Sequence, residues 1–447
     1  MVKSSSQKCF LLLLFLLFLT APASAQVVED RLCDTAFEDC RQPIWDLIDN
    51  ETVGIDVAFW FMDDTSYVPK LINKFNSGVP VRVLVDPRAS LTHPVNQQVL
   101  DQLAAAGIPM RKNVVTGGVL HWKMMLFVGQ NKVQFSAANY GPQNFVPTNP
   151  NVDYIDELIY ITNLSSVVNS FKTKYDDKWI DTNRFANYAN INGALTRKYP
   201  IFTKDPEINY PPEESFANRA TANYNQETQQ IDAIIFRNTD DRHADAFIAA
   251  INRGVPVRIL QEPETYRTTT YFRHSYNIDR MYMAGAQVKS RAHAGLTHEK
   301  LVLLHSKGMA IFGSSNMSVP SSDSQDEHNY FTQRSNIYQA LVTQFDHKWN
   351  STSEYQPFVP LPPDEPVSPS PSNGSFTSSP NVTLQWEGGF FAWKYDVYFG
   401  TTSNPPLLTS NLNTGFPGPG TPETYTLQRS SPAQLTSGRS SARRWQT

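Results

Sequence analysis

The stretch GVPVRVLVD at residues 78–86 returns almost unchanged as GVPVRILQE at residues 254–262, and this repetition decides the fold. A second repeated segment precedes each of these: the apolar run IDVAFW at 55–60 matches IDAIIF at 231–236. The two copies are offset by 254 − 78 = 176 residues at the first repeated segment and by 231 − 55 = 176 residues at the second. A constant offset across neighbouring blocks indicates a duplicated domain.

Within each copy, apolar strand-like runs alternate with amphipathic helical stretches. Residues 55–60 and 81–85 of the first copy read as buried strands, and residues 67–76 between them read as a helix that ends at a glycine. The second copy has the same order, with its helix over 244–253. This alternation predicts βαβ units and a mostly parallel sheet in each copy. We therefore predict an α/β protein with two similar α/β/α sandwiches, related by pseudo-two-fold symmetry and sharing one cleft.

Changes in composition divide the 447 residues into six segments. Stretches rich in proline and polar residues follow each copy. Further on, residues 382–386 and 395–400 alternate like strands of a β-sandwich, whereas the Ser/Arg-rich residues 429–447 show no strand to complete it. The predicted segments are a signal peptide at 1–25, a first repeat at 26–182, a connecting loop at 183–229, a second repeat at 230–352, a linker at 353–380 and a small, incomplete β module at 381–447.

The amino terminus has the features of a secretory signal peptide. Lys3 and Lys8 precede a short apolar run, and the small residues 23–25 provide a cleavage site. We expect cleavage after residue 25 and export of the mature chain. Cys33 and Cys40 are then the two remaining cysteines, and an oxidising compartment favours a disulfide between them.

The charge of the mature chain argues against a long nucleic acid as substrate. The sequence has 38 Lys and Arg and 42 Asp and Glu residues, and loss of the signal peptide removes two lysines, so the balance is 36 − 42 = −6. Proteins that bind polynucleotides usually carry a basic excess or a basic stripe. The composition favours a lipid or a small diester.

Each copy carries a His-x-Lys pair with an asparagine sixteen residues after the lysine. The first set is His121, Lys123 and Asn139, where 139 − 123 = 16. The second set is His298, Lys300 and Asn316, where 316 − 300 = 16. Residues i and i+2 of a strand point to the same face, so each histidine projects together with its lysine.

Two such strands side by side place two imidazoles and two ammonium groups around one small volume. This set suits cleavage of a phosphodiester without a metal ion or other cofactor. One imidazole attacks phosphorus, and the other protonates the leaving alkoxide. The lysines and asparagines neutralise the charge on the non-bridging oxygens.

The duplicated pattern resembles the phospholipase D superfamily over roughly residues 53–349. The resemblance implies a phosphodiesterase that forms a phosphohistidine, with a phospholipid or other phosphodiester as substrate and transient contact with a membrane surface. It also implies an acid beyond each asparagine that hydrogen-bonds a catalytic histidine, and Glu157 and Glu327 match that position. By analogy with the family, His121 is the nucleophile. Trp60, Phe61, Tyr140 and Phe145 are expected as exposed aromatics near the motifs, which favours a lipid.

The chain departs from the family pattern at two points. An aspartate follows the family's lysine after four intervening residues, and this chain has Val128 and His305 there. His305 and Lys307 also form a competing His-x-Lys pair, but Lys307 lies only 316 − 307 = 9 residues before Asn316, so we favour His298 and Lys300. Two other functions stay open: a metal-independent nuclease of the same superfamily, and a catalytically decayed binding protein.

Overall fold

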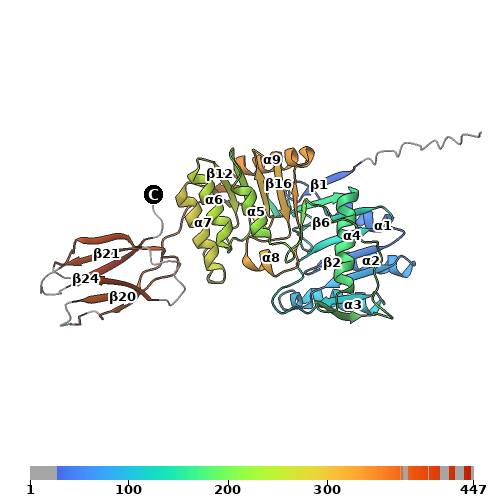
Figure 1. Ribbon diagram of the computed structural model, residues 1–447, viewed down its shortest axis with the longest axis horizontal. Coiled ribbons are helices and arrows are strands. Elements are labelled where there is room, and N and C mark those ends of the chain that lie inside the picture. The colour runs from blue at the N-terminus through green and yellow to red at the C-terminus, as the bar shows by residue number, and fades with distance from the viewer. Residues whose placement is uncertain are drawn as a thin grey trace, which may run out of the picture.

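The computed structural model describes residues 28–372, 374–375, 381–400, 402–412, 422–427 and 437–443. The expected signal peptide at 1–25 lies outside these residues. Figure 1 shows three bodies in a row along the long axis: the first repeat, the second repeat and a β module at the carboxyl-terminal end. Within the described ranges, no helix is both long and apolar enough to cross a bilayer.

A mixed eight-stranded sheet forms the centre of the first repeat, in the order β1-β8-β6-β5-β2-β3-β4-β9. Helices α1, α2 and α3 pack on one face of this sheet, and α4 packs on the other. The central strand β2 is buried along its whole length because helices cover both faces. The elements are β1 (Asp30–Asp34), α1 (Arg41–Asn50), β2 (Ile55–Phe59), α2 (Tyr67–Asn76), β3 (Val81–Val85), α3 (Pro94–Ala105), β4 (Met110–Asn113), β5 (Lys123–Phe127), β6 (Lys132–Ser136), β7 (Asp153–Asp156), β8 (Leu158–Thr162), α4 (Ser165–Ile180) and β9 (Phe185–Ala189).

The second repeat has an eight-stranded sheet in the order β10-β17-β16-β15-β11-β12-β13-β18, which matches the first sheet strand for strand. Helices α5, α6 and α7 pack on its outer face, and α9 packs on the inner face. The elements are β10 (Ile208–Asn209), α5 (Phe216–Tyr224), β11 (Ile231–Ile235), α6 (Asp241–Asn252), β12 (Val257–Gln261), α7 (Phe272–Ala284), β13 (Gln287–Arg291), β14 (Ala294–Thr297), β15 (Leu301–Leu304), β16 (Met309–Gly313), α8 (Val319–Asp323), β17 (Asn329–Thr332), α9 (Ser335–Asn350) and β18 (Tyr355–Pro357).

Both sheets are mixed, which corrects the expectation of mostly parallel sheets. Strands β2, β3 and β4 run parallel, as do β11, β12 and β13, because helices connect them. The strands of the His-x-Lys pairs, β5 and β15, run antiparallel to β2 and β11. Hairpins then join them to β6 and β16, and a tight hairpin connects only antiparallel neighbours.

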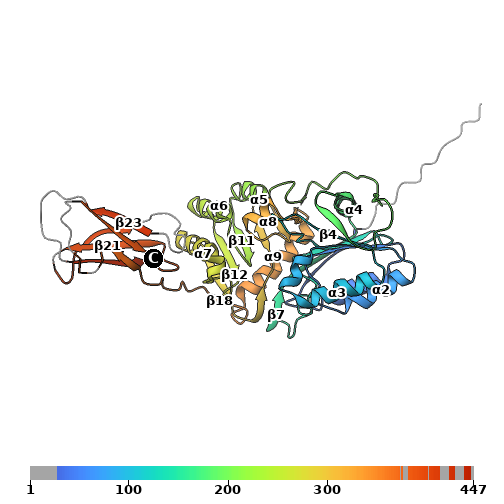
Figure 2. The same ribbon diagram turned by 90° about the horizontal axis from the view of Figure 1, so that it is seen from below.

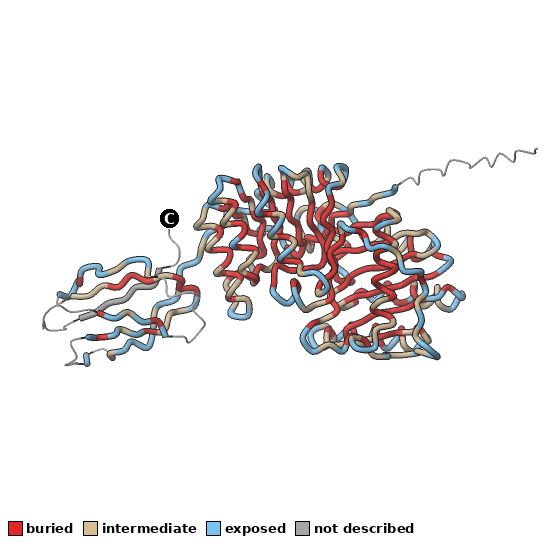
Figure 3. The backbone as a smooth tube through the Cα atoms, viewed as in Figure 1, coloured by how far each residue is buried: buried red, intermediate tan, exposed pale blue. Residues whose placement is uncertain are grey.

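One hydrophobic core joins the two repeats, and it includes residues of both sheets and of helices α4 and α9. Phe135 of β6 stacks on Phe312 of β16, with ring centroids 6.2 Å apart. Tyr160 of β8 stacks on Tyr330 of β17, with centroids 5.8 Å apart. Figure 3 shows buried backbone running through both sheets. Equivalent strands therefore meet each other at the junction, as pseudo-two-fold symmetry requires.

The segment predicted as a connecting loop at 183–229 contains regular structure, which corrects that prediction. Strand β9 pairs with β4 and extends the first sheet. Strand β10 pairs with β17, and α5 packs with α6 in the second repeat. Both strands lie at sheet edges, where strand propensity depends strongly on context, so their sequences show little periodicity.

The linker predicted at 353–380 also contains two strands. Strand β18 pairs with β13 and completes the second sheet, and its residue Tyr355 is fully buried. Strand β19 (Val367–Ser370) belongs to the carboxyl-terminal module. Edge strands of three or four residues beside prolines are too short to give a periodic signal.

The carboxyl-terminal module consists of two three-stranded sheets, ordered β19-β20-β23 and β22-β21-β24 (Figure 2). The further strands are β20 (Val382–Glu387), β21 (Lys394–Gly400), β22 (Leu407–Leu412), β23 (Pro422–Leu427) and β24 (Ser437–Arg443). Strand β24 lies where no strand was predicted, and it pairs with β21 through backbone groups, which need no apolar pattern. Phe391 and Trp393 pack on Phe272 of α7, so the module contacts the second repeat.

Candidate active site

The two His-x-Lys pairs lie at the junction of the repeats, at the start of β5 and β15. An open pocket of about 790 Å³ lies there, lined by His121, His298, Asn139 and Asn316. Part of its wall is aromatic and apolar, with Trp60, Phe61, Val119, Ile155, Phe236, Tyr271 and Leu296, and the rest is polar, with Asp63, His93, Gln143, Asn144, Arg237 and Gln325 beside the histidines and asparagines. The structure brings both predicted histidines and both predicted asparagines to one cavity.

Each histidine is held by a glutamate of the other repeat. The Nδ1 atom of His121 lies 2.8 Å from Oε2 of Glu327. The Nδ1 atom of His298 lies 2.6 Å from Oε1 of Glu157. When the glutamate is ionised it only accepts hydrogen bonds, so Nδ1 of the histidine then carries the proton and Nε2 keeps its lone pair. The contacts cross between the repeats, and neither repeat alone contains a complete half-site.

Short strand pairings between the repeats bring each glutamate next to the histidine of the other repeat. Strand β7 pairs in parallel with β14, and the backbone N–H of His298 donates to the carbonyl of Asp156 at 3.0 Å. In the other half, a bridge joins Leu120 to Asp326, and the N–H of His121 donates to the carbonyl of Asp326 at 2.9 Å. Each glutamate directly follows one of these aspartates, which sets it against its histidine.

The two lysines lie beside the histidines and are buried from solvent. Nζ of Lys123 donates to the carbonyl oxygen of His121 at 2.8 Å, and Nζ of Lys300 donates to that of His298. Burial lowers the pKa of Lys123 well below its usual value, and it lowers the pKa of Lys300 to about 7. An anion bound beside these groups favours their charged forms.

Burial favours the neutral forms of both histidines near pH 7. Burial lowers the pKa of His121 well below its usual value, and the nearby ammonium of Lys123 lowers it further. Burial also lowers the pKa of His298, while Glu157 opposes that shift. Burial raises the pKa of Glu327 to about 7, against the effect of Lys123. A neutral imidazole with a free Nε2 is the form that attacks phosphorus.

The competing pair His305 and Lys307 lies outside the pocket. Nε2 of His305 lies 2.7 Å from Oδ2 of Asp232 on β11. Nζ of Lys307 donates to the side chains of Asn223 and Gln226. These contacts occupy both groups on another part of the second repeat, and neither is among the described residues that line the pocket.

Two of the four aromatic residues expected at the surface belong to the core, which corrects that expectation. Tyr140 and Phe145 are fully buried because they pack against Tyr67 of α2. Trp60 and Phe61 line the pocket. The middle residues of the motifs, Trp122 and Glu299, are buried away from the pocket, as strand alternation predicts.

The sequence profile of a family described as "Cardiolipin synthase, PLD-like domain" matches residues 44–179 and 221–349. Each matched segment contains one His-x-Lys pair and its asparagine. The chain belongs to this family of PLD-like proteins. A comparison with curated proteins found no match.

Solved structures show the same fold. The phosphatidylserine synthase of Haemophilus influenzae has a TM-score of 0.56 at 13% identity, over 73% of this chain and 87% of that one. The polyphosphate kinase of Porphyromonas gingivalis has a TM-score of 0.51 at 12% identity, over 72% of this chain. The match spans about half of that kinase, 51% of its length.

Behind each His–Glu pair of the PLD-like repeats, a buried lysine holds the aspartate that precedes the glutamate. Nζ of Lys348 on α9 lies 2.6 Å from Oδ1 of Asp156. Lys178 on α4 pairs with Asp326, which Arg184 also binds at 2.9 Å. Each lysine precedes the tryptophan near the end of its helix, so the two networks are equivalent.

The Lys348 network contains a group of three carboxylates with the spacing of a metal site: Asp34, Asp156 and Glu299. The ammonium of Lys348 lies between them, at 2.7 Å from Asp34, 2.6 Å from Asp156 and 3.0 Å from Glu299. The ammonium of Lys348 therefore pairs with all three carboxyl groups, and burial raises the pKa of Asp34 to about 6 and that of Glu299 well above its usual value. The group is a structural ion network behind His298.

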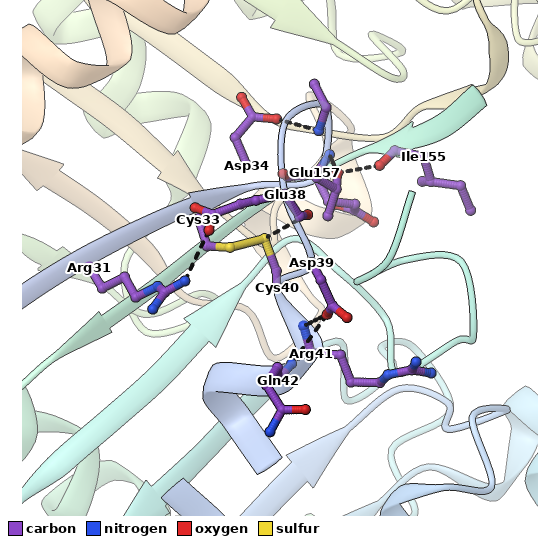
Figure 4. Close-up of a disulfide and its surroundings, with 12 residues drawn as sticks. Arg31, Cys33, Asp34, Glu38, Asp39, Cys40, Arg41, Gln42, Ile155 and Glu157 are labelled. Carbon is purple, nitrogen blue, oxygen red and sulfur yellow. Dashed lines mark hydrogen bonds and ion pairs between the residues drawn. A yellow bond between two sulfur atoms is a disulfide. The ribbon is translucent and has the colours of Figure 1, made fainter. Parts of the chain in front are cut away.

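The disulfide between Cys33 and Cys40 adjoins the same network. Its Cα atoms lie 5.7 Å apart, and Figure 4 shows it close to Ile155 and Glu157. Within the eight-residue loop, Thr35 accepts from the backbone N–H of Glu157 at 2.9 Å and donates its own N–H to the carbonyl of Glu157 at 3.2 Å. The loop therefore holds the glutamate that orients His298.

Sequence reasoning missed several residues of this site. Lys178 and Lys348 lie outside the predicted His-x-Lys sets, and their only signal in the sequence is that each precedes a tryptophan, Trp179 or Trp349. Arg237 and Tyr271 line the pocket but belong to no predicted motif. A position-by-position comparison of the repeats reveals Arg237, because 237 − 176 = 61 and the first repeat has Phe61 there.

Proposed function

We propose that this protein is a phosphodiesterase that hydrolyses the head-group diester of a phospholipid through a phosphohistidine intermediate. The observation that supports this proposal is the pair of crossed His–Glu contacts, His121 with Glu327 and His298 with Glu157, beside one pocket. Two equivalent imidazoles facing one cavity suit a reaction that needs a nucleophile on one side of phosphorus and an acid on the other.

In the first step, Nε2 of His121 attacks phosphorus, and the bond from phosphorus to the leaving oxygen breaks. His298 gives its proton to that oxygen, and the alcohol departs. In the second step, His298 takes a proton from water, and the hydroxide displaces His121 from phosphorus. The product is a phosphomonoester, and both histidines return to their starting states. The negative charge of the bound diester favours the protonated form that His298 needs for the first step.

The cations of the protein support this reaction without a divalent metal. Lys123 and Lys300 carry the positive charge, and Asn139 and Asn316 offer amide N–H donors at the pocket. The proposal therefore expects turnover to continue in the presence of a chelator.

A phospholipid is favoured over a polynucleotide by charge and by the pocket wall. The mature chain has an acidic balance of −6 after signal removal (36 − 42). Trp60, Phe236 and Leu296 give the pocket an apolar side that suits a lipid diester. Transient contact with a membrane surface would deliver that substrate.

The experiment offers phosphatidylcholine vesicles and single-stranded DNA to the protein side by side, with a chelator in both. Choline release supports the proposal. Cleavage of DNA alone replaces it with a nuclease, and absence of turnover on both replaces it with a decayed binding protein.

We also propose that the protein is exported after cleavage behind Ala25. The basic start, the apolar run and the disulfide between Cys33 and Cys40 support this. Sequencing the amino terminus of protein collected from the culture medium tests it. A mature terminus at Gln26 agrees, whereas an uncut chain retained inside the cells does not.

A further inference from the structure

The pseudo-two-fold symmetry of the site is broken at one pair of equivalent positions on the pocket wall. Phe61 follows β2 in the first repeat, and Arg237 follows β11 at the same place in the second repeat (237 − 61 = 176). Each of these residues stacks on the residue that precedes the third helix of its repeat. Phe61 lies on His93, with ring centroids 3.6 Å apart, and the guanidinium of Arg237 lies 4.6 Å from the ring centroid of Tyr271.

The two stacks differ in charge. In the first repeat, Nδ1 of His93 lies 3.0 Å from Oδ2 of Asp63, so an acid neutralises the imidazole when it is protonated. The position equivalent to Asp63 in the second repeat is Thr239, which carries no charge (239 − 63 = 176). Within the described residues, no carboxylate lies at ion-pair distance from Arg237, and its Nε is buried without a hydrogen-bond partner.

Arg237 thus brings an uncompensated positive charge to the wall of the pocket that His121 and His298 also line. Burial lowers the pKa of His121 and of Lys300, and the charge of Arg237 lowers both further, so Arg237 acts on both halves of the site. A guanidinium is always charged, and its fork of N–H donors matches carboxylate and phosphate groups. Among the described residues, no carboxylate of the protein pairs with the guanidinium of Arg237. Its N–H donors are therefore available for an anionic group of a ligand.

We propose that Arg237, supported by Tyr271, binds a second anionic group of the substrate, separate from the phosphodiester that is cleaved. This inference rests on the proposed function and names its substrate class: diesters that carry a further phosphate or carboxylate on one of their alcohols. Because only one repeat has this cation, it also fixes which end of the diester lies on the His298 side. The symmetric histidines alone cannot make that choice.

The test compares two 4-nitrophenyl diesters, one of glycerol phosphate and one of glycerol bisphosphate, which differ only by the second phosphate. Wild-type protein should prefer the bisphosphate compound in kcat/KM by about tenfold or more, the effect of one charge-assisted hydrogen bond. Arg237→Gln should remove this preference, because it lowers kcat/KM for the bisphosphate compound much more than for the other diester, while Arg237→Lys should keep part of it. Phe61→Leu, at the equivalent position, should keep the preference.

If Arg237→Gln lowers kcat/KM equally for both diesters, the inference is overturned, because Arg237 then binds the phosphate that is cleaved. Absence of a preference in the wild-type protein would overturn it as well. Calorimetry with glycerol 1-phosphate and glycerol 1,3-bisphosphate gives a readout without turnover. The inference expects the bisphosphate to bind more tightly than the monophosphate, and Arg237→Gln to abolish that difference. This result supports the second-anion site even when neither diester is hydrolysed. Only the proposed function is then wrong. Equal binding of both compounds overturns the inference.

Discussion

Lys300 and Glu327 each have a pKa of about 7, so the charge of the site changes most near that pH. Burial lowers the pKa of Lys300 to about 7, so the ammonium is present below pH 7 and is lost as the pH rises above it. His121 has a pKa well below its usual value and stays neutral across that range. The account therefore predicts that kcat/KM falls above about pH 7, because kcat/KM reports the free enzyme.

Lys300→Arg provides the control for this pH prediction. The guanidinium stays charged at all accessible pH values, so the alkaline fall should move to higher pH, even if the maximum rate is lower. A pH profile of kcat/KM for both proteins is the measurement. An unchanged alkaline limb in Lys300→Arg would show that another group titrates there.

Lys348 positions the His298 half of the site through Asp156 and Glu157. Lys348→Met leaves three buried carboxylates without their cation, which should cost about 3–5 kcal/mol of unfolding free energy. It should also shift the pH profile of kcat/KM, because the field around the His298–Glu157 pair changes.

The matched control is Lys178→Met in the equivalent network. Arg184 still pairs with Asp326 in that variant, so the loss of unfolding free energy should be smaller. Urea denaturation of both variants and their pH profiles are the measurements. Equal losses of stability, or an unshifted profile in Lys348→Met, would contradict a positioning role.

At the scale of elements, the loop closed by the disulfide between Cys33 and Cys40 contacts the backbone of Glu157 in the site. Replacing Cys33 and Cys40 with serine should lower the unfolding free energy by about 2–3 kcal/mol, since the closed loop is short. It should also lower kcat, because Thr35 no longer fixes the backbone of Glu157. Denaturation curves and turnover at a temperature where the variant stays folded measure both effects.

Thr35→Val separates these two effects, because it keeps the disulfide and removes the hydroxyl that accepts from Glu157. It should lower kcat with a smaller loss of stability than the cysteine variant. Full turnover in the folded cysteine variant would rule out a role of the loop in the site.

The elements that sequence analysis predicted well are those buried on both faces. The runs at 55–60 and 231–236 form β2 and β11, which are apolar because helices cover both sides of them. Among the strands that it missed, β9, β18 and β24 lie at sheet edges, and within the described residues each pairs on one side only. An edge strand is specified mainly by its partner's backbone, so its own sequence carries little pattern.

At the scale of the whole molecule, duplication made the site partly predictable. The paired spacing singled out His121, His298, Asn139 and Asn316, and the structure places these four residues around one pocket. The crossed contacts, in which Glu327 serves His121 and Glu157 serves His298, depend on β7 pairing with β14 across the junction. Such pairing between distant segments leaves no local pattern in the sequence.

The account's central claim is that two half-sites perform one reaction. The most direct test traps the phosphoenzyme during turnover in the wild type, His121→Ala and His298→Ala. The reaction is quenched rapidly without acid, and the phosphorylated peptides are then mapped. We predict phosphohistidine at His121 in the wild type and none in His121→Ala, with turnover reduced at least about a hundredfold in each variant. Phosphate on neither histidine, or turnover that persists in either single variant, would contradict one active site built from two repeats.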